Sequence, residues 1–175
     1  MCIRDRIDLP SAFDVDMSRE YLEKRKITSG EFYYTDNFKK FANIIKPRTF
    51  DDERSEPRIV IPLYDREGVL FGLQGRSLLP NKVKYITIIL DEDQPKVYGL
   101  EKLDPSDRVY VVEGPFDSTF VTNSLAMCGA DVSLDTLDID ELVYVYDNEP
   151  RNREICNRIS KVIDAGKKVV IFPSI

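Results

Sequence analysis

The feature that most constrains the fold of this chain is a pair of short, wholly apolar runs, each followed directly by acidic residues. Val109–Val112 is followed at once by Glu113, and Leu142–Tyr146 is followed by the acidic stretch 147–149. Apolar runs of this length, without polar alternation, are typical of strands buried on both faces, as in parallel α/β sheets. Ligands of open α/β sheets bind at the carboxyl ends of the strands. The sequence therefore predicts that acidic side chains gather at one edge of an α/β sheet.

The second part of the chain alternates predicted strands with predicted helices. Helices are expected over Phe116–Met127 and Arg151–Ala165, and a third buried strand is expected over Lys168–Phe172. In the second helix Ile155, Ile159, Val162 and Ile163 form one apolar stripe, and Gly166 follows as a C-terminal glycine. This alternation predicts a parallel sheet with right-handed crossovers.

The first part of the chain reads as a mixed α+β region. Helices are expected over 17–26 and within Tyr34–Lys46, before a polar loop at 47–57. Arg58–Leu63 and Val69–Leu73 flank a turn and predict a β-hairpin, with a further strand over Lys82–Leu90. We therefore expect a mixed α+β subdomain at 1–104 and an α/β domain at 105–175.

Composition excludes several kinds of chemistry. The 175 residues contain no histidine, so neither a Ser-His-Asp triad nor a histidine-ligated metal is available. The three cysteines are far apart, which argues against a structural zinc site or a disulfide framework and favours the cytoplasm. No apolar run is long enough to span a membrane. Carboxylates remain, and they favour hard divalent cations.

The acidic charge is concentrated where the predicted site lies. Residues 1–86 hold 16 basic and 14 acidic residues, a balance of +2, whereas 87–175 hold 9 and 17, a balance of −8. If the two acidic strand ends are neighbours, the carboxylates of Glu113, Asp147 and Glu149 converge, and a cation must offset their repulsion. We predict that these three residues are catalytic and bind Mg²⁺ or Mn²⁺. Asp117 is a further candidate ligand, although an aspartate near a helix start is often only a cap.

Several motifs resemble one family of enzymes. VVEGPFDS, followed by VYVYDNE, is similar to the TOPRIM signature that primases, topoisomerases and some nucleases share. The upstream segment RIVIPLYDREGVLFGLQGR resembles the segment that precedes the TOPRIM core in replicative DNA primases of the bacterial and phage type. Lys84-Tyr85, the KVYGL element at 96–100 and REYLEKRKIT at 19–28 are similar to further elements of that family.

The resemblance implies an activity and a set of roles. It implies a DNA primase that uses ribonucleoside triphosphates to synthesise short RNA primers on a single-stranded DNA template by metal-dependent nucleotidyl transfer, with a replicative helicase as partner. Glu113, Asp147 and Glu149 would hold the metal. The implied contacts with template phosphates and nucleotide come from four basic residues: Arg58, Arg76, Lys84 and Lys96.

The sequence departs from the family pattern in three ways. Glu149 stands where the family has a second aspartate, the Cys/His set of a zinc-binding module is missing, and the chain stops at Ile175, before further acids of the family are expected. We therefore expect a truncated catalytic region. Two alternatives stay open: a TOPRIM-type nuclease that uses the same acids to activate water, and an inactive module that binds single-stranded DNA or a helicase.

Overall fold

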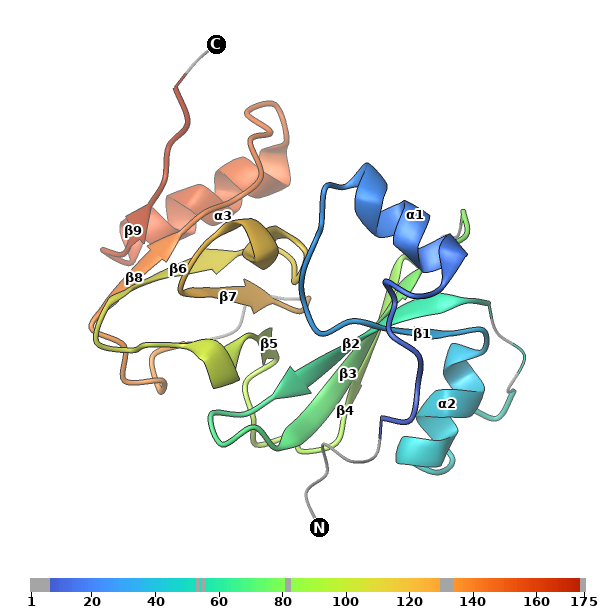
Figure 1. Cartoon of the computed structure of the whole chain (residues 1–175). Coiled ribbons are helices and arrows are strands. Elements are labelled where there is room, and N and C mark those ends of the chain that lie inside the picture. Colours follow the sequence, from blue (N-terminus) through green and yellow to red (C-terminus); the bar gives the residue numbers. More distant parts are fainter. Residues whose placement is uncertain (1–6, 53, 55, 81–82, 130–133, 174–175) are drawn as a thin grey trace. The chain divides into compact units, whose positions relative to one another are not determined.

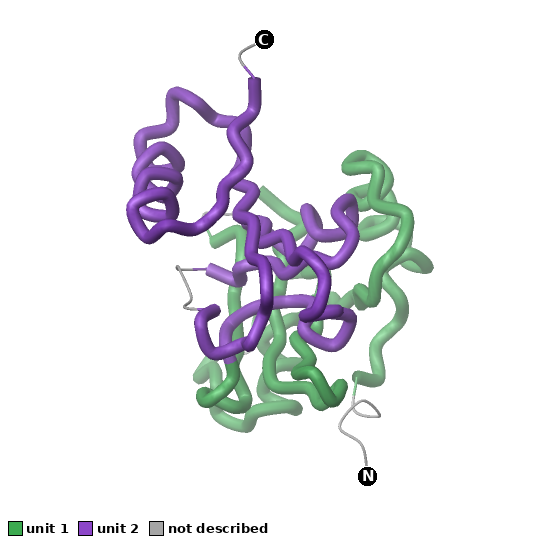
Figure 2. Tube along the Cα trace, turned by 90° about the vertical axis from the view of Figure 1, so that its left-hand side faces the viewer, with its two compact units in different colours: residues 1–94 green, residues 95–175 purple. Residues whose placement is uncertain are grey.

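The chain forms two compact units, residues 1–94 and 95–175 (Figure 2). The computed structural model describes residues 7–52, 54, 56–80, 83–129 and 134–173. Among the helices in these ranges, none combines the length and the apolar character that crossing a membrane requires. The mixed fold, with one antiparallel sheet and one largely parallel sheet, is the α/β class that the sequence predicts.

The first unit contains an antiparallel sheet with strand order β1-β2-β3-β4 (Figure 1). The predicted hairpin is confirmed, since residues 58–64 pair antiparallel with 70–77. Its turn is closed by Asp65, whose carboxylate accepts from the Val69 amide, and by Gly68 at φ 77°. The elements of this unit are α1 (Asp16–Lys24), β1 (Tyr33–Thr35), α2 (Phe38–Ile45), β2 (Arg58–Tyr64), β3 (Leu70–Ser77) and β4 (Tyr85–Ile89).

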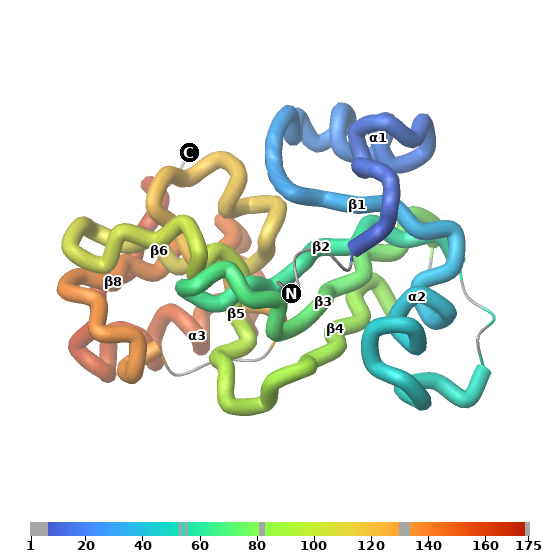
Figure 3. The backbone as a smooth tube through the Cα atoms, turned by 60° about the horizontal axis from the view of Figure 1, so that its bottom comes forward, coloured from blue at the N-terminus to red at the C-terminus, as the bar shows by residue number. Residues whose placement is uncertain are grey.

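Helix α2 covers one face of this sheet (Figure 3). The side chain of Asn37 caps the helix by accepting from the Lys40 amide, and the next residue, Phe38, is fully buried. Phe38 packs with Val60 and Leu73 in a core cluster of the unit. Aromatic packing of this kind leaves no room for an added methyl group in the sheet beneath it.

Gly75→Ala should destabilise the protein by about 2 kcal/mol, because an added methyl group would overpack the core. A Cβ at position 75 would lie 2.5 Å from a ring carbon of Phe38, which is too close for two carbon atoms. Gly166→Ala is the comparison: its Cβ would meet nothing within 4 Å, and only the strain of φ +70° remains, about 1 kcal/mol. Urea unfolding of both variants measures the difference, and equal losses would contradict the packing argument.

The second unit contains a five-stranded sheet with order β5-β7-β6-β8-β9 (Figure 1). Strand β5 is antiparallel to β7, and the remaining neighbours are parallel. Because β5 pairs with β7, residues 95–104 belong to this unit, whereas the expected boundary followed residue 104. The elements are β5 (Val97–Tyr98), the 3₁₀ turn η2 (Leu100–Lys102), β6 (Arg108–Val112), the 3₁₀ turn η3 (Asp117–Phe120), β7 (Ser124–Met127), β8 (Glu141–Tyr144), α3 (Arg153–Asp164) and β9 (Lys168–Val169).

One predicted element of this unit is wrong, and another is present but shorter than predicted. The segment 116–127 is not a helix but the turn η3 followed by strand β7. Its apolar run Leu125–Met127 is buried between β5 and β6, so strand pairing outweighs the helical pattern. The last predicted strand is also shorter and less buried than expected, since β9 ends at Val169 and Phe172 is 42% exposed.

Helix α3 agrees with its prediction. Asn152 caps its first turn by accepting from the Glu154 amide, and Gly166 at φ 70° follows its end. Ile155 and Val162 of the apolar stripe are buried, whereas Ile163 is half-exposed. The buried part of the stripe therefore fixes which face of α3 is turned inward.

Candidate active site

Two of the predicted acids meet at the carboxyl ends of neighbouring strands. Strands β6 and β8 are parallel neighbours, with Val111 opposite Tyr144, so the residues that follow them come together. An oxygen of Glu113 accepts a hydrogen bond from the main-chain amide of Asp147 at 3.1 Å. Glu113 thus ties the end of β6 to the loop that follows β8.

A cation that the sequence analysis missed completes this pair. Arg158 of α3 donates to the other oxygen of Glu113 at 3.2 Å and also pairs with Glu154, one turn earlier on the helix. The helical pattern contained a signal for it. Arg158 lies three residues after Ile155 and four before Val162, so it shares their inward face.

The environment of Glu113 disfavours its negative charge. The pKa of its carboxyl group is raised, first because burial removes it from water and also because the Asp147 carboxylate lies close by. The Asp147 amide and the Arg158 guanidinium act in the opposite direction without cancelling the rise. A cation placed between the two carboxylates would favour their charged forms.

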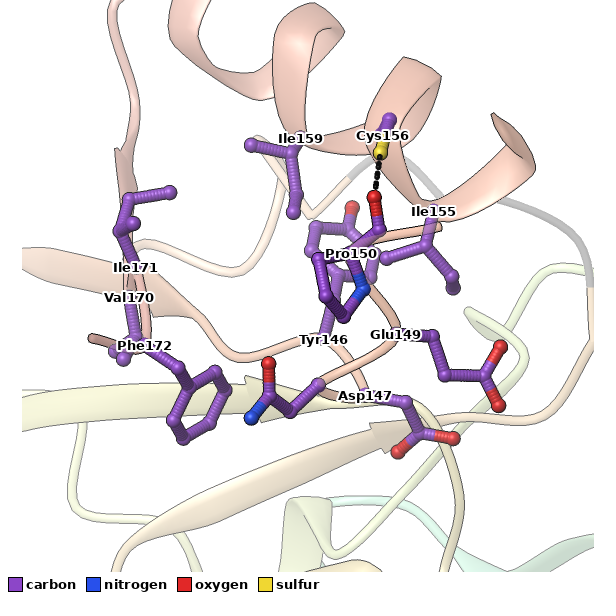
Figure 4. Close-up of a pocket in the computed structure, with 11 residues that line it drawn as sticks. Tyr146, Asp147, Glu149, Pro150, Ile155, Cys156, Ile159, Val170, Ile171 and Phe172 are labelled. Atoms are coloured by element: carbon purple, nitrogen blue, oxygen red, sulfur yellow. Dashed lines mark hydrogen bonds between the residues drawn. The ribbon is translucent and has the colours of Figure 1, made fainter. Parts of the chain in front are cut away.

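The third predicted acid lies apart from this pair. The main-chain amide of Glu149 donates to the Asp147 carbonyl at 2.8 Å, which closes a tight turn. The extended backbone that would put both side chains on one face is therefore absent. The Glu149 carboxylate instead accepts from the Asn152 side chain at 2.6 Å. Figure 4 shows Asp147 and Glu149 on this turn, beside a small pocket.

Asp117, the fourth candidate, begins the turn η3 and is exposed. One of its carboxylate oxygens lies 3.0 Å from the point where a Cβ on Gly114 would stand, so the glycine permits this close approach. Across the described residues, no three His, Cys, Asp or Glu side chains are grouped as a ready-made metal site. The predicted cluster is thus a carboxylate pair, Glu113 and Asp147, with Asp117 and Glu149 outside it.

This donor set still fits a magnesium ion. Mg²⁺ takes hard oxygen ligands, keeps several waters and is commonly held by one or two carboxylates together with substrate phosphates. Glu113 and Asp147 supply such carboxylates, and the Arg158 guanidinium does not cancel the burial that disfavours the charged form of Glu113. A calcium-type cage with six or more protein oxygens has no counterpart in this pair.

Arg58 cannot line a substrate groove as predicted, because its side chain is only 1% exposed. Its guanidinium is a buried tie between strands. It donates to the carbonyl oxygens of Gly75 at 2.8 Å, Lys84 at 3.3 Å and Val83 at 3.1 Å, and it pairs with Glu56. Its Nε–H has no acceptor but is buried as well, so no edge of the guanidinium is open to a phosphate.

The other three predicted basic residues keep surface positions. Arg76 lies on β3 and is partly buried, and Lys84, just before β4, is exposed. Lys96 is exposed in the second unit, where its carbonyl oxygen accepts from the Cys128 amide. Arg76 and Lys84 both belong to the first unit, and Arg76 lies opposite Tyr85, the residue that follows Lys84.

Known proteins resemble this chain in sequence and in fold. No protein-family profile matches it. The DNA primase of Enterobacteria phage T4 is 38% identical over 175 residues, an alignment that covers 94% of this chain and 51% of the phage protein. The chain thus spans about half the length of this curated relative.

Solved structures agree at the level of the fold. The RNA polymerase domain of Mycobacterium tuberculosis primase DnaG superposes with a TM-score of 0.70 at 19% identity, covering 98% of this chain and 74% of that one. The Aquifex aeolicus primase gives 0.68 at 20%, covering 94% and 51%. A DnaG primase catalytic domain bound to single-stranded DNA gives 0.65 at 18%, covering 95% and 67%. The chain is therefore similar in sequence to about half of a phage DNA primase, and its fold is that of solved catalytic regions of bacterial DNA primases.

Proposed function

We propose that this chain is the catalytic part of a DNA primase, which joins ribonucleotides into short RNA primers on a single-stranded DNA template. The observation that carries the proposal is the Glu113–Asp147 pair at the ends of two parallel strands, in a chain 38% identical to a phage DNA primase. No residue of the chain is required as a covalent nucleophile. The reaction needs a place for divalent metal and phosphates, which a TOPRIM-type acidic edge supplies.

In this proposal Glu113 and Asp147 hold Mg²⁺ or Mn²⁺. The bound ion would lower the pKa of the attacking hydroxyl group and stabilise the charge on the phosphate. Arg158 holds Glu113 from the side of α3 at 3.2 Å, so it fixes the direction of that carboxylate. Glu113 in turn holds the loop after β8 through the Asp147 amide.

The partners follow from the same proposal. A related primase domain has been solved with single-stranded DNA, and another with a DNA duplex that carries a six-nucleotide overhang. We infer a single-stranded DNA template for this chain, contacted by Arg76 and Lys84 of the first unit and by Lys96 of the second. Ribonucleoside triphosphates are the proposed substrates, and a replicative helicase is the proposed protein partner.

The decisive experiment measures incorporation of labelled ribonucleotides on single-stranded DNA by the 175-residue chain, with Mg²⁺, with Mn²⁺ and with a chelator. Primer synthesis that requires the metal is the expected result. DNA nicking without nucleotides would instead assign a TOPRIM-type nuclease. Binding of DNA without metal dependence and without incorporation would identify a binding module.

Mg²⁺ should also stabilise the folded chain, which can be measured without any assay of activity. If the ion binds only the native state and its free concentration is ten times its dissociation constant, it adds about 1.4 kcal/mol to the free energy of unfolding. Thermal melts followed by circular dichroism, with and without Mg²⁺, measure this shift. Asp147→Asn should reduce the shift, and an equal shift in both proteins would place the ion elsewhere.

A further inference from the structure

Four side chains of the first unit form a continuous series of contacts between cations and aromatic rings. The guanidinium of Arg25, at the end of α1, lies 5.0 Å from the ring centre of Tyr21. The guanidinium of Arg76, on β3, lies 5.6 Å from the same ring and 4.7 Å from the ring of Tyr85 on β4. We call these four residues the cation–ring series.

Arg76 differs from Arg58, its neighbour on β2, in the groups that surround its guanidinium. Within the part of the chain that the structure describes, its guanidinium contacts the two rings and has no carboxylate partner, and its buried Nε–H has no acceptor. Arg58, which lies on the neighbouring strand, spends its donors on three carbonyl oxygens and Glu56. Both arginines keep a buried Nε–H without an acceptor, but Arg58 is paired with the carboxylate of Glu56, whereas Arg76 has no carboxylate partner among the described residues.

A charge that is withdrawn from water without an opposite charge is costly, so its retention calls for a ligand. The face of an aromatic ring attracts a guanidinium but does not neutralise it. Two rings therefore hold the plane of Arg76 while its edge can still form paired hydrogen bonds with a phosphate. Tyr85 is 38% exposed and the preceding residue, Lys84, is exposed, so the edge of the unit at Tyr85 is accessible to a single strand of DNA.

We propose that Tyr21 and Tyr85 are positioning residues that hold Arg76 ready for a backbone phosphate of single-stranded DNA. This inference rests on the proposed template-binding function and adds the residues that orient one of its contacts. A flexible arginine loses conformational entropy when it binds a phosphate. The two rings already order the Arg76 side chain in the free protein, so less entropy is lost on binding.

The test is the affinity of the 175-residue chain for a fluorescein-labelled oligothymidylate, measured by anisotropy over a range of salt concentrations. Arg76→Gln should weaken binding and lower the salt slope by about 0.7, the value for one phosphate contact on a single strand. Tyr85→Leu should weaken binding about three- to tenfold, whereas Tyr85→Phe, which keeps the ring, should stay within about twofold. Arg54→Gln, at a 94% exposed arginine outside the cation–ring series, is the charge control.

The double variant distinguishes positioning from a merely structural role. If Tyr85 acts through Arg76, Tyr85→Leu costs no further affinity once Arg76→Gln is present. Equal costs in both backgrounds, or a Tyr85→Leu variant that binds like the wild type, would overturn the positioning role even if wild-type binding and primer synthesis were intact. A wild-type chain that binds no oligothymidylate would overturn template binding itself, and the positioning role with it. Thermal melts of each variant confirm that the fold is retained.

Discussion

Glu113→Gln should lower the rate of primer synthesis by at least about 100-fold, the loss typical when one preorganised charged group at a reaction centre is removed. Glutamine keeps the shape of the side chain and can still accept the Asp147 amide. It removes the negative charge that, in our proposal, holds the metal and that orients Arg158. The rate of ribonucleotide incorporation at saturating Mg²⁺ measures the effect.

The same substitution should leave the fold intact, which separates a lost reaction from a lost structure. Burial raises the pKa of Glu113, so its charged form is disfavoured in the native state. The stability that this raised pKa contributes is present below the unfolded pKa, about 4.3, and is lost as the pH rises through the folded value. At neutral pH the substitution removes the Glu113–Arg158 ion pair, but it also removes a charge that burial disfavours. The two effects offset each other, so the free energy of unfolding in urea should change by less than about 1 kcal/mol.

Two other variants show whether the effect belongs to this carboxylate. Glu154 is the other carboxylate partner of Arg158, and its side chain is 73% exposed. Glu154→Gln should therefore leave the rate of primer synthesis within about threefold of the wild type. Glu149→Gln tests the three-acid prediction. A loss as large as that of Glu113→Gln would bring Glu149 back into the metal site, and a Glu113→Gln enzyme with full activity would refute the site altogether.

Arg58→Met should destabilise the first unit by about 3–5 kcal/mol, the cost of removing one partner from a buried charged pair. The substitution removes the Arg58 donor from Glu56 and from the carbonyl oxygens of Val83 and Lys84. Methionine fills part of the space, but it offers no N–H group. The free energy of unfolding from urea titration measures the loss.

Arg76→Met is the matched control, because the two arginines lie on adjacent strands. The guanidinium of Arg58 is hydrogen-bonded to carbonyl oxygens, whereas that of Arg76 contacts aromatic rings. Its loss of two ring contacts should cost about 1 kcal/mol or less. Arg58→Lys should rescue little, since a single ammonium group cannot reproduce the fork that spans three carbonyl oxygens. Similar unfolding free energies for Arg58→Met and Arg76→Met would contradict the buried tie.

Much of the site could be predicted because its parts are local. Buried runs such as Val109–Val112 end in acids within the same few residues, and parallel pairing then brings their ends together. This is why Glu113 and Asp147 were predicted as neighbours. The turn at Asp65–Val69 and the cap and final glycine of α3 are likewise written in adjacent residues.

Other features depend on neighbours that local patterns do not reveal. Helical periodicity over 116–127 was overruled by the strands that flank Leu125–Met127. The separation of Glu149 from Asp147 results from one main-chain hydrogen bond. Arg58 and Arg76 look alike in the sequence. Carbonyl oxygens surround Arg58 and give it a structural role, whereas aromatic rings flank Arg76 and leave its charge without a carboxylate partner among the described residues.

The sequence by itself determined the two acidic strand ends, the class of the fold and the resemblance to primases, because short apolar runs and their adjoining residues carry that information. The tertiary structure alone decided that Glu149 lies outside the Glu113–Asp147 pair, that Arg158 joins the pair and that Arg58 is buried. The physical reason is that a charged side chain is assigned its partner by whichever groups the packed fold places around it, and those groups come from distant parts of the chain.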